Sequence, residues 1–271
     1  MILVTGSKRS GTSLWMQVLA AAGLPVIGER FPRGWEELIA DHNPDGFFES
    51  ELSAGIYFRT NPHPTTGAYL FPEQTRWHAV KVFVPGLVRS DVAFIDRVIA
   101  TVREWREHAA STLRLRADLA RQSAGAIDPD ALLHPALEWW SETFTLLRDI
   151  ATRRHAVHVQ SYQGLLDDPA RVIRAVIGWL GQGDAAAAIA AVRGDRRRTP
   201  ERPALELPAG LEAHHVAAFD ALYDDIHRGR PLTPAFVAHL NAIDGELRPL
   251  LVAHNARLRQ AALDRLADAP R

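Results

Sequence analysis

Short apolar runs rich in β-branched residues alternate with segments of helical periodicity along the first two thirds of the chain. The runs that predict buried strands cover residues 2–5, 78–84, 97–102 and 155–160. Parallel strands need long crossover connections, which are usually helices. The alternation therefore predicts an α/β fold, in which a parallel sheet is flanked by helices.

The segment 169–180 carries the clearest helix signals. Asp168 can cap its N-terminus, Pro169 suits the first helical position, and Gly181 follows its end. Its apolar residues recur at helical spacing: Val172, Ile173, Val176, Ile177 and Leu180. We expect this face to pack on the sheet.

Two further helices are predicted at 12–22 and 130–152. We interpret Trp139 and Trp140, in the second of these, as core residues. Residues 43–75 differ, because they are rich in proline, glycine, asparagine and aromatic residues. They predict long loops with short helices at the mouth of the sheet.

Beyond residue 200 the pattern changes to alanine- and leucine-rich helices, predicted at 209–228 and 234–268. Pro249 is expected to kink or split the second of these. We therefore divide the chain into an α/β domain, residues 1–200, and a helical extension, residues 201–271. The extension packs either on that domain or on a partner subunit, so a homodimer through these helices stays open.

Residues 6–13, with the sequence GSKRSGTS, follow the first strand and predict a phosphate loop. Two glycines five residues apart permit a tight turn with inward N–H groups, and the following helix adds the positive end of its dipole. In nucleoside triphosphatases a lysine follows the second glycine. Here Thr12 stands at that position and the charge comes from Lys8 and Arg9, which indicates a different anionic ligand.

A second polar group follows the strand at 97–102. Arg103 stands at the strand end, and Ser111 follows eight residues later on a predicted helix. Because the carboxyl ends of parallel strands open to the ligand crevice, this pair can bind a second phosphate. A third polar segment, residues 161–169 with the sequence SYQGLLDDP, follows the last predicted strand.

These three segments, in this order, resemble the sulfotransferases that use 3′-phosphoadenosine 5′-phosphosulfate (PAPS). That family has a loop of the form [KR]SG[TS][TS], which residues 9–13 match. It also has an arginine followed eight residues later by a serine, as in Arg103 and Ser111, although Glu104 and Trp105 replace the usual Asp-Pro.

The third segment resembles the family's YEDLxxDP-like motif. Tyr162 and residues 165–169 match it, and Gln163 stands where glutamate is usual. The resemblance covers residues 1–182 and implies a phosphate-loop fold.

The resemblance also implies roles for these residues. The 5′-phosphosulfate of PAPS, or the 5′-phosphate of its product PAP, would be held by Lys8, Arg9, Ser10, Gly11, Thr12 and Ser13. Arg9 would stabilise the leaving oxygen, and Arg103 and Ser111 would hold the 3′-phosphate. Tyr162 would pack near the adenine or position the donor.

The acceptor hydroxyl needs a base, and the resemblance offers two positions. Small-molecule sulfotransferases have a histidine two residues after a strand-end lysine. Here Phe83 stands at that position, two residues after Lys81. Protein-tyrosine sulfotransferases have a glutamate in a Gly-Glu pair twenty residues after the loop arginine, and Glu29 stands at that spacing. We predict Glu29 as the base, and three histidines stay as alternatives: His42, His63 and His78.

Composition narrows the functional classes. The chain has 271 residues, of which 47% are hydrophobic, so it can bury a full core. A formal net charge of −1 provides no basic field for coating nucleic acid. The absence of cysteine excludes disulfides and thiolate zinc sites. Because we also find neither a signal peptide nor a transmembrane segment, we expect a cytoplasmic enzyme.

We expect a sulfotransferase that moves a sulfuryl group from PAPS to a small-molecule, carbohydrate or lipid-linked hydroxyl. No metal is expected, because sulfuryl carries less charge than phosphoryl and no predicted strand ends in a metal-holding aspartate. Two other classes stay open. One is a phosphate-loop kinase or NTPase that uses ATP and magnesium, and the other is a non-catalytic PAP-binding module.

Three features lie outside these motifs. Glu49 is a candidate acceptor-site residue. The arginine-rich run from Arg193 to Arg202 either folds over the nucleotide or is a solvated loop. His214 and His215 are neighbours on a predicted helix and are expected to point in different directions, which disfavours a metal site.

Overall fold

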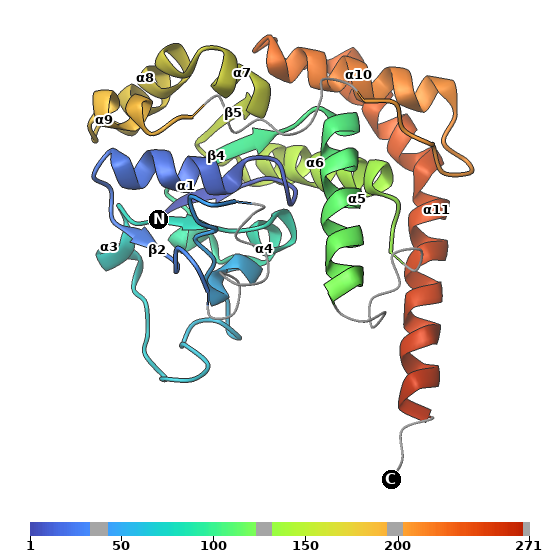
Figure 1. Cartoon of the computed structure of the whole chain (residues 1–271), viewed down its shortest axis with the longest axis horizontal. Helices are drawn as coiled ribbons and strands as arrows, with labels where there is room; N and C mark the ends of the chain where they lie inside the picture. Colours follow the sequence, from blue (N-terminus) through green and yellow to red (C-terminus); the bar gives the residue numbers. More distant parts are fainter. Residues whose placement is uncertain (33–42, 123–131, 194–202, 268–271) are drawn as a thin grey trace.

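The protein is an α/β structure built on a five-stranded, all-parallel sheet (Figure 1). The computed structural model describes residues 1–32, 43–122, 132–193 and 203–267. The strand order is β2-β3-β1-β4-β5. The strands are β1 (Ile2–Thr5), β2 (Val26–Ile27), β3 (Ala79–Lys81), β4 (Arg97–Val102) and β5 (Val157–Ser161).

Helices connect the strands and follow the last one. Those up to β5 are α1 (Thr12–Ala21), α3 (Pro72–Thr75), α4 (Val84–Arg89), α5 (Trp105–Gln122) and α6 (Pro135–Arg153), with 3-10 helices η2 (Glu51–Ala54) and η3 (Val92–Phe94). Those after β5 are α7 (Tyr162–Asp167), α8 (Pro169–Leu180), α9 (Ala185–Ala190), α10 (Ala213–His227) and α11 (Pro234–Ala267).

Successive residues of the central strand face opposite layers. Ile2 and Val4 belong to a core with α1, α8 and α9, whereas Leu3 packs in a second core with η2 and α4. All four residues of β1 are buried. A strand that is covered on both faces reads as a continuous apolar run, which is why the sequence pattern located β1 correctly.

The predicted strands and helices are confirmed, with shifts at their ends. The strand predicted to reach residue 84 ends at Lys81, because Val84 begins α4 and Pro85 lies in its first turn. The helix predicted from residue 130 is described from Pro135, where His134 accepts a hydrogen bond from Ala136 N. Asp168 caps α8 as predicted, and Gly181 ends it in a left-handed conformation.

The C-terminal helices share a core with the α/β layers. Phe219 of α10 is fully buried and stacks on Trp140 of α6, with ring centroids 4.8 Å apart. Trp139 and Trp105 also contact the Phe219 ring. The prediction that Trp139 and Trp140 are core residues is confirmed. Continuous α11 runs through Pro249, so the predicted splitting is wrong.

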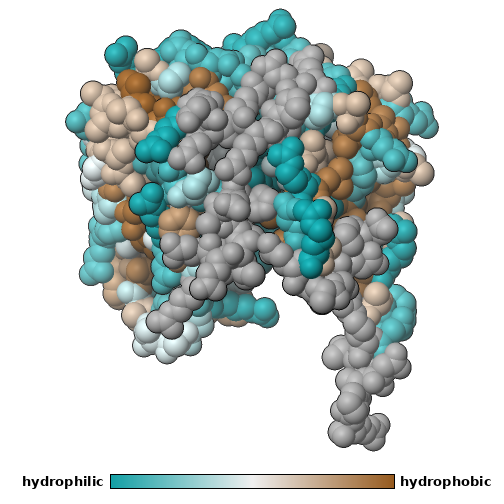
Figure 2. Space-filling model, viewed as in Figure 1, coloured by the Kyte–Doolittle hydropathy of each residue, from teal (hydrophilic) through white to brown (hydrophobic). Residues whose placement is uncertain are grey.

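In Figure 1, α11 leads away from the rest of the chain toward the C-terminus. Figure 2 shows hydrophobic residues on this face in separate patches among hydrophilic ones. Within the described ranges, no helix combines the length and apolar character that crossing a membrane requires.

Candidate anion-binding and active site

The loop between β1 and α1 forms a tight turn at the carboxyl end of the central strand. Gly11 precedes the helix with a φ of 100°, and Arg9 at the crest has a φ of 71°, an uncommon value for a residue with a side chain. Ser10 N donates to Ser7 O over 3.1 Å and closes the turn. The first-turn N–H groups of α1 have no carbonyl partner within the helix, so they are suited to an anion.

Neighbouring elements hold the loop in place. Thr101 of β4 donates its hydroxyl to Ser10 O over 3.0 Å. A Cβ atom at Gly6 would come within 3 Å of Thr101 O, and one at Gly11 would overlap the ring of Tyr162. Glycine is therefore required at both positions by close contacts and not only by the backbone turn.

The structure brings the two predicted phosphate-binding elements together. Arg9 Nε donates to Ser111 Oγ over 3.2 Å, and Arg103 Nη1 donates to Arg9 O over 3.2 Å. Arg103 and Ser111 are each 6% exposed, so both lie under the loop and not on the open surface. Residues about a hundred positions apart in the chain therefore form one polar cluster.

Two further groups position Arg103. Its Nε donates to Glu107 Oε2 over 3.3 Å within α5, and its guanidinium lies 4.9 Å from the centroid of the Tyr162 ring. Tyr162 thus contacts both Gly11 and Arg103, which places it at the loop. Glu107 was not predicted, although its spacing of four residues from Arg103 is a readable helix signal.

A second cluster lies on the other side of the loop. Lys81, at the end of β3, is almost completely buried and pairs with Glu49, with 2.5 Å between Nζ and Oε1. Its ammonium also donates to Ser13 Oγ over 3.1 Å and to Phe47 O over 2.9 Å. Burial lowers the pKa of Lys81, and the charge of Glu49 opposes that shift.

The remaining predicted loop residues differ in exposure. The Lys8 side chain is exposed, and its ammonium lies 5.5 Å from the centroid of the Phe83 ring. Thr12 is 4% exposed at the first position of α1. The Ser10 hydroxyl is buried and makes no hydrogen bond within the described chain.

Glu29 lies just beyond the edge strand β2. Its backbone N–H donates to Glu49 O over 2.8 Å, which ties it to the segment that Lys81 and Ser13 contact. Its side chain is exposed to solvent. Glu29 is therefore tied through its backbone to the segment that contains Glu49, and its side chain is exposed.

The alternative histidines are placed as follows. His63 accepts backbone hydrogen bonds from Thr65 and Thr66 in the long loop before β3, and His78 directly precedes β3. His42 lies outside the described residues.

One histidine that sequence reasoning missed, His108 of α5, is fully buried. Burial is the main cause that lowers the pKa of His108 to about 3, and the positive charge of Arg103 is the second cause.

A carboxyl with one enclosed oxygen was also missed. Glu142 of α6 has an enclosed carboxylate oxygen, Oε2, that makes no hydrogen bond within the described chain. Burial is the main cause that raises the pKa of Glu142 to about 8, and the negative charge of Glu138 adds to this rise. The positive charge of Lys8 lowers the same pKa. No local pattern marks Glu142, because its environment comes from distant segments.

The expectation that His214 and His215 point in different directions is wrong. Their rings lie 3.9 Å apart, and both hydrogen-bond Glu246 Oε2 of α11, at 2.6 Å and 3.1 Å. Neighbouring side chains converge here because Glu246 approaches from another helix. The three side chains are close enough to share an ion. However, His215 Nδ1 accepts the Glu212 N–H over 3.0 Å, which leaves the proton on Nε2 and disfavours metal binding there.

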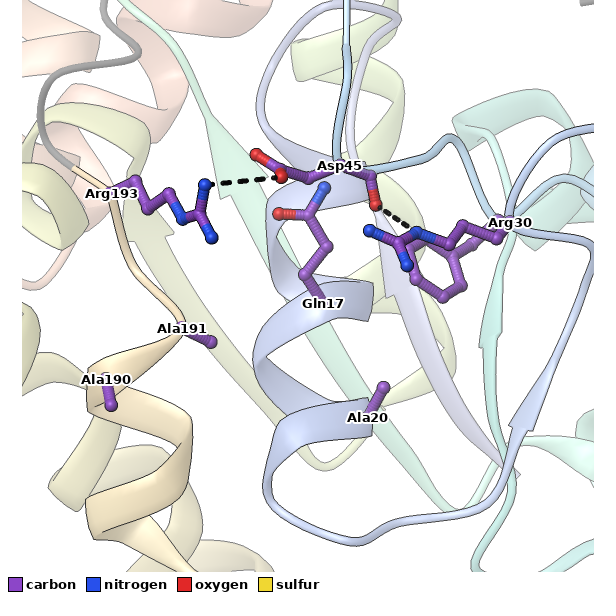
Figure 3. A pocket seen from close by; sticks show the side chains of 8 residues that line it. Gln17, Ala20, Arg30, Asp45, Ala190, Ala191 and Arg193 are labelled. Atoms are coloured by element: carbon purple, nitrogen blue, oxygen red, sulfur yellow. Dashed lines mark hydrogen bonds and ion pairs between the residues drawn. The ribbon is translucent and has the colours of Figure 1, made fainter. Parts of the chain in front are cut away.

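A pocket of about 400 Å³ lies along α1, beyond the loop. Figure 3 shows Gln17 and Ala20 of α1, with Arg193 on one side, Arg30 on the other and Asp45 between the two arginines. Arg30 Nε donates to Asp45 O over 3.0 Å, and Arg193 lies 4.0 Å from the Asp45 carboxylate. The rest of the predicted basic run, from residue 194 to Arg202, lies outside the described residues.

No protein-family model matches the chain, and no curated protein matches it. Among solved structures, the chain is similar to the sulfotransferase domain from the Synechococcus PCC 7002 olefin synthase, with 17% identity and a TM-score of 0.46. The match covers 82% of this chain and 94% of that chain. At this identity and TM-score the likeness does not bear on function, which is argued below from the residues of the site.

Proposed function

We propose that the protein is a sulfotransferase that moves the sulfuryl group of PAPS to a hydroxyl acceptor. One observation carries the proposal: Arg9 donates to Ser111 and Arg103 donates to the Arg9 carbonyl, so that the two predicted anion-binding elements meet. PAPS is charged at both its 5′ and 3′ ends. A site that binds both charged ends of PAPS distinguishes PAPS from ATP, which has no 3′-phosphate.

The residues present fit the 5′ end of this donor. The turn offers N–H groups at the start of α1, and the enclosed Ser10 hydroxyl has no hydrogen-bond partner in the described chain. A buried hydroxyl without a hydrogen-bond partner lowers the stability of the fold unless a ligand supplies the partner. Arg9 and Lys8 supply positive charge at the crest.

In the proposed transfer, the chain aligns donor and acceptor and neutralises the charge on the leaving oxygen. Arg9 holds the bridging oxygen, and Arg103 with Ser111 holds the 3′-phosphate. Lys81, fixed by Glu49, donates to the Ser13 hydroxyl in the first turn of α1 and so holds that turn in place. Tyr162 fixes the position of Arg103 relative to the loop through its contacts with both.

The acceptor class that we propose is a hydroxyl on a small molecule, a carbohydrate or a lipid-linked sugar. These cationic groups and N–H donors carry the proposed chemistry without a divalent ion, because the sulfuryl group bears less charge than a phosphoryl group. Glu29 remains one candidate for the base.

The proposal is tested by comparing PAP with ATP and magnesium in thermal unfolding. We expect PAP at about 100 times its Kd to stabilise the fold by about 2.7 kcal/mol, a shift of about 5–10 °C for a chain of this size. ATP with magnesium should give no comparable shift. The opposite result would indicate a kinase or NTPase. PAP binding without PAPS turnover on a panel of alcohols and sugars would indicate a non-catalytic module.

A further inference from the structure

The pocket along α1 contains polar side chains that the proposed donor site does not use. It encloses about 400 Å³, within the range of about 300–1,000 Å³ that is typical of small-molecule sites. Figure 3 shows the Gln17 amide, the Asp45 carboxylate and the Arg193 guanidinium turned toward a common space. The small side chains of Ala20 and Ala190 also line the pocket. Convergent polar groups beside small apolar ones are the usual features of a ligand site.

The three polar groups place hydrogen-bond donors next to acceptors. Arg193 Nη1 and Asp45 Oδ1 lie 4.0 Å apart, which is beyond hydrogen-bond distance. A hydroxyl beside both can therefore accept from the guanidinium and donate to the carboxylate, and the Gln17 amide offers a donor and an acceptor of its own. An anionic group only accepts hydrogen bonds, and the Asp45 charge would repel it. The pocket therefore suits a ligand with several hydroxyl groups better than it suits a carboxylate or a phosphate.

The wall that carries Asp45 is fixed by two neighbouring side chains. Gln17 Nε2 donates to Asn43 Oδ1 and to Gly46 O, each over 3.3 Å. Arg30 Nε donates to Asp45 O over 3.0 Å. These bonds hold the wall against α1 before a ligand arrives, which lowers the conformational entropy that binding must overcome.

Hydrogen bonds connect this wall to the predicted phosphate loop. Its next residue, Phe47, accepts at its carbonyl from Ser13 Oγ over 3.2 Å and from Lys81 Nζ over 2.9 Å. Ser13 belongs both to that loop and to the first turn of α1. Gln17 follows Ser13 by four residues on the same face of the helix, about 6 Å further along its axis. The pocket therefore begins about one helical turn from the loop.

We propose that this pocket binds one sugar unit of an oligosaccharide acceptor, next to the unit whose hydroxyl receives the sulfuryl group. The inference rests on the proposed sulfotransferase function. It narrows the acceptor from any hydroxyl compound to a saccharide, because a ligand needs hydroxyl groups beyond the reacting one to occupy both places. A simple alcohol at the loop would leave the pocket empty.

The test measures disaccharide binding by saturation-transfer difference NMR, with PAP bound and without it. The probes are maltose, cellobiose and N,N′-diacetylchitobiose, each compared with the methyl glycoside of its monosaccharide unit. We expect at least one disaccharide to bind the PAP complex about tenfold or more tightly than its monosaccharide. The reason is that the second unit adds hydrogen bonds to charged side chains of the pocket.

Two variants show where the disaccharide binds. Arg193→Ala removes a hydrogen-bond donor from the pocket, and Ala20→Trp fills the pocket but removes no polar group. Each should raise the Kd of the disaccharide about tenfold or more and leave PAP affinity unchanged, which also shows that the variant is folded. Arg174→Ala serves as the control, because Arg174 is an exposed arginine of α8 and does not line the pocket. It should leave both affinities unchanged.

The result for the pocket is separate from the result for the donor site. Absence of disaccharide binding to the wild type, or equal binding in the wild type and both pocket variants, would overturn the saccharide assignment and leave the proposed function standing. Failure of PAP to bind the wild type would instead overturn the proposed function. The disaccharide titrations without PAP would then still test the pocket by itself.

Discussion

In the proposed function, donor selectivity depends on Arg103. Its guanidinium is held by Glu107, by the Arg9 carbonyl and by the Tyr162 ring, so it is preorganised before a ligand arrives. We expect Arg103→Ala to weaken PAP binding by about 1.5–3 kcal/mol, the range for hydrogen bonds to charged groups. Titration calorimetry at fixed salt measures the change.

Arg174 offers a matched control, because it is an exposed arginine on α8. Arg174→Ala should leave PAP affinity unchanged. Equal affinity in the wild type and in Arg103→Ala would remove the 3′-phosphate assignment.

Glu142 also predicts a pH dependence of stability. Its pKa in the folded chain is about 8, above the ordinary 4.5, so the folded state holds a proton that the unfolded state has lost. Stability therefore falls as pH rises from 4.5 toward 8, by up to about 1.4 kcal/mol per pH unit from this group, and levels off above 8. Below 4.5 both states are protonated and the effect vanishes.

Glu142→Gln should remove this part of the slope, so that the variant is more stable than the wild type at pH 8. Urea unfolding at pH 5 and pH 8 measures the difference. Val252→Ala, at an exposed position of α11, gives the control, because it removes no ionisable group and should keep the wild-type slope. An unchanged slope in Glu142→Gln would show that this carboxyl titrates normally.

At the scale of elements, the phosphate loop depends on its contact with the start of α7. Gly11→Ala would place a methyl group into the Tyr162 ring and would also hold alanine at a φ of 100°. We expect a loss of about 1–3 kcal/mol in unfolding free energy and a loss of PAP binding. Thermal unfolding with and without PAP reports both.

Gly23 separates these two causes. It has a φ of 85°, but a Cβ atom there would meet nothing within 4 Å. Gly23→Ala should therefore show the backbone strain alone, about 1–2 kcal/mol, with normal PAP binding. Similar loss of PAP binding in both variants would mean that the contact with Tyr162 does not shape the loop.

At the scale of the whole molecule, we propose that the α/β layers and the C-terminal helices unfold as one unit. Phe219 is fully buried among Trp105, Trp139 and Trp140, so the two regions share side chains in one core. We expect Phe219→Ala to cost about 3–5 kcal/mol and to keep a single transition. Tryptophan fluorescence and far-UV circular dichroism should give coincident curves.

Val252, which is 60% exposed on α11, gives the control. Val252→Ala should change stability by less than about 0.5 kcal/mol. Separate transitions for the two probes would show instead that the boundary predicted near residue 200 divides two independent domains.

Much of the fold could be predicted because its signals are local. Both glycines of the phosphate loop, the cap at Asp168 and the apolar run of β1 lie within a few residues of the structure they specify. The limits of β3 were mispredicted, and of the two outcomes predicted at Pro249, a kink or a split, the split is wrong. Packing and hydrogen bonds from neighbouring elements decide where such segments end.

The sequence by itself determined the order of the strands and helices along the chain, the glycine-containing turn at residues 6–13 and the candidate residues Arg9, Arg103 and Ser111. These follow from spacing and backbone chemistry. Tertiary structure alone decided that Ser111 lies beside Arg9 and that one carboxylate oxygen of Glu142 is enclosed. Burial and pKa depend on neighbours that are distant in the chain, so they arise only when the sheet and its helices have packed.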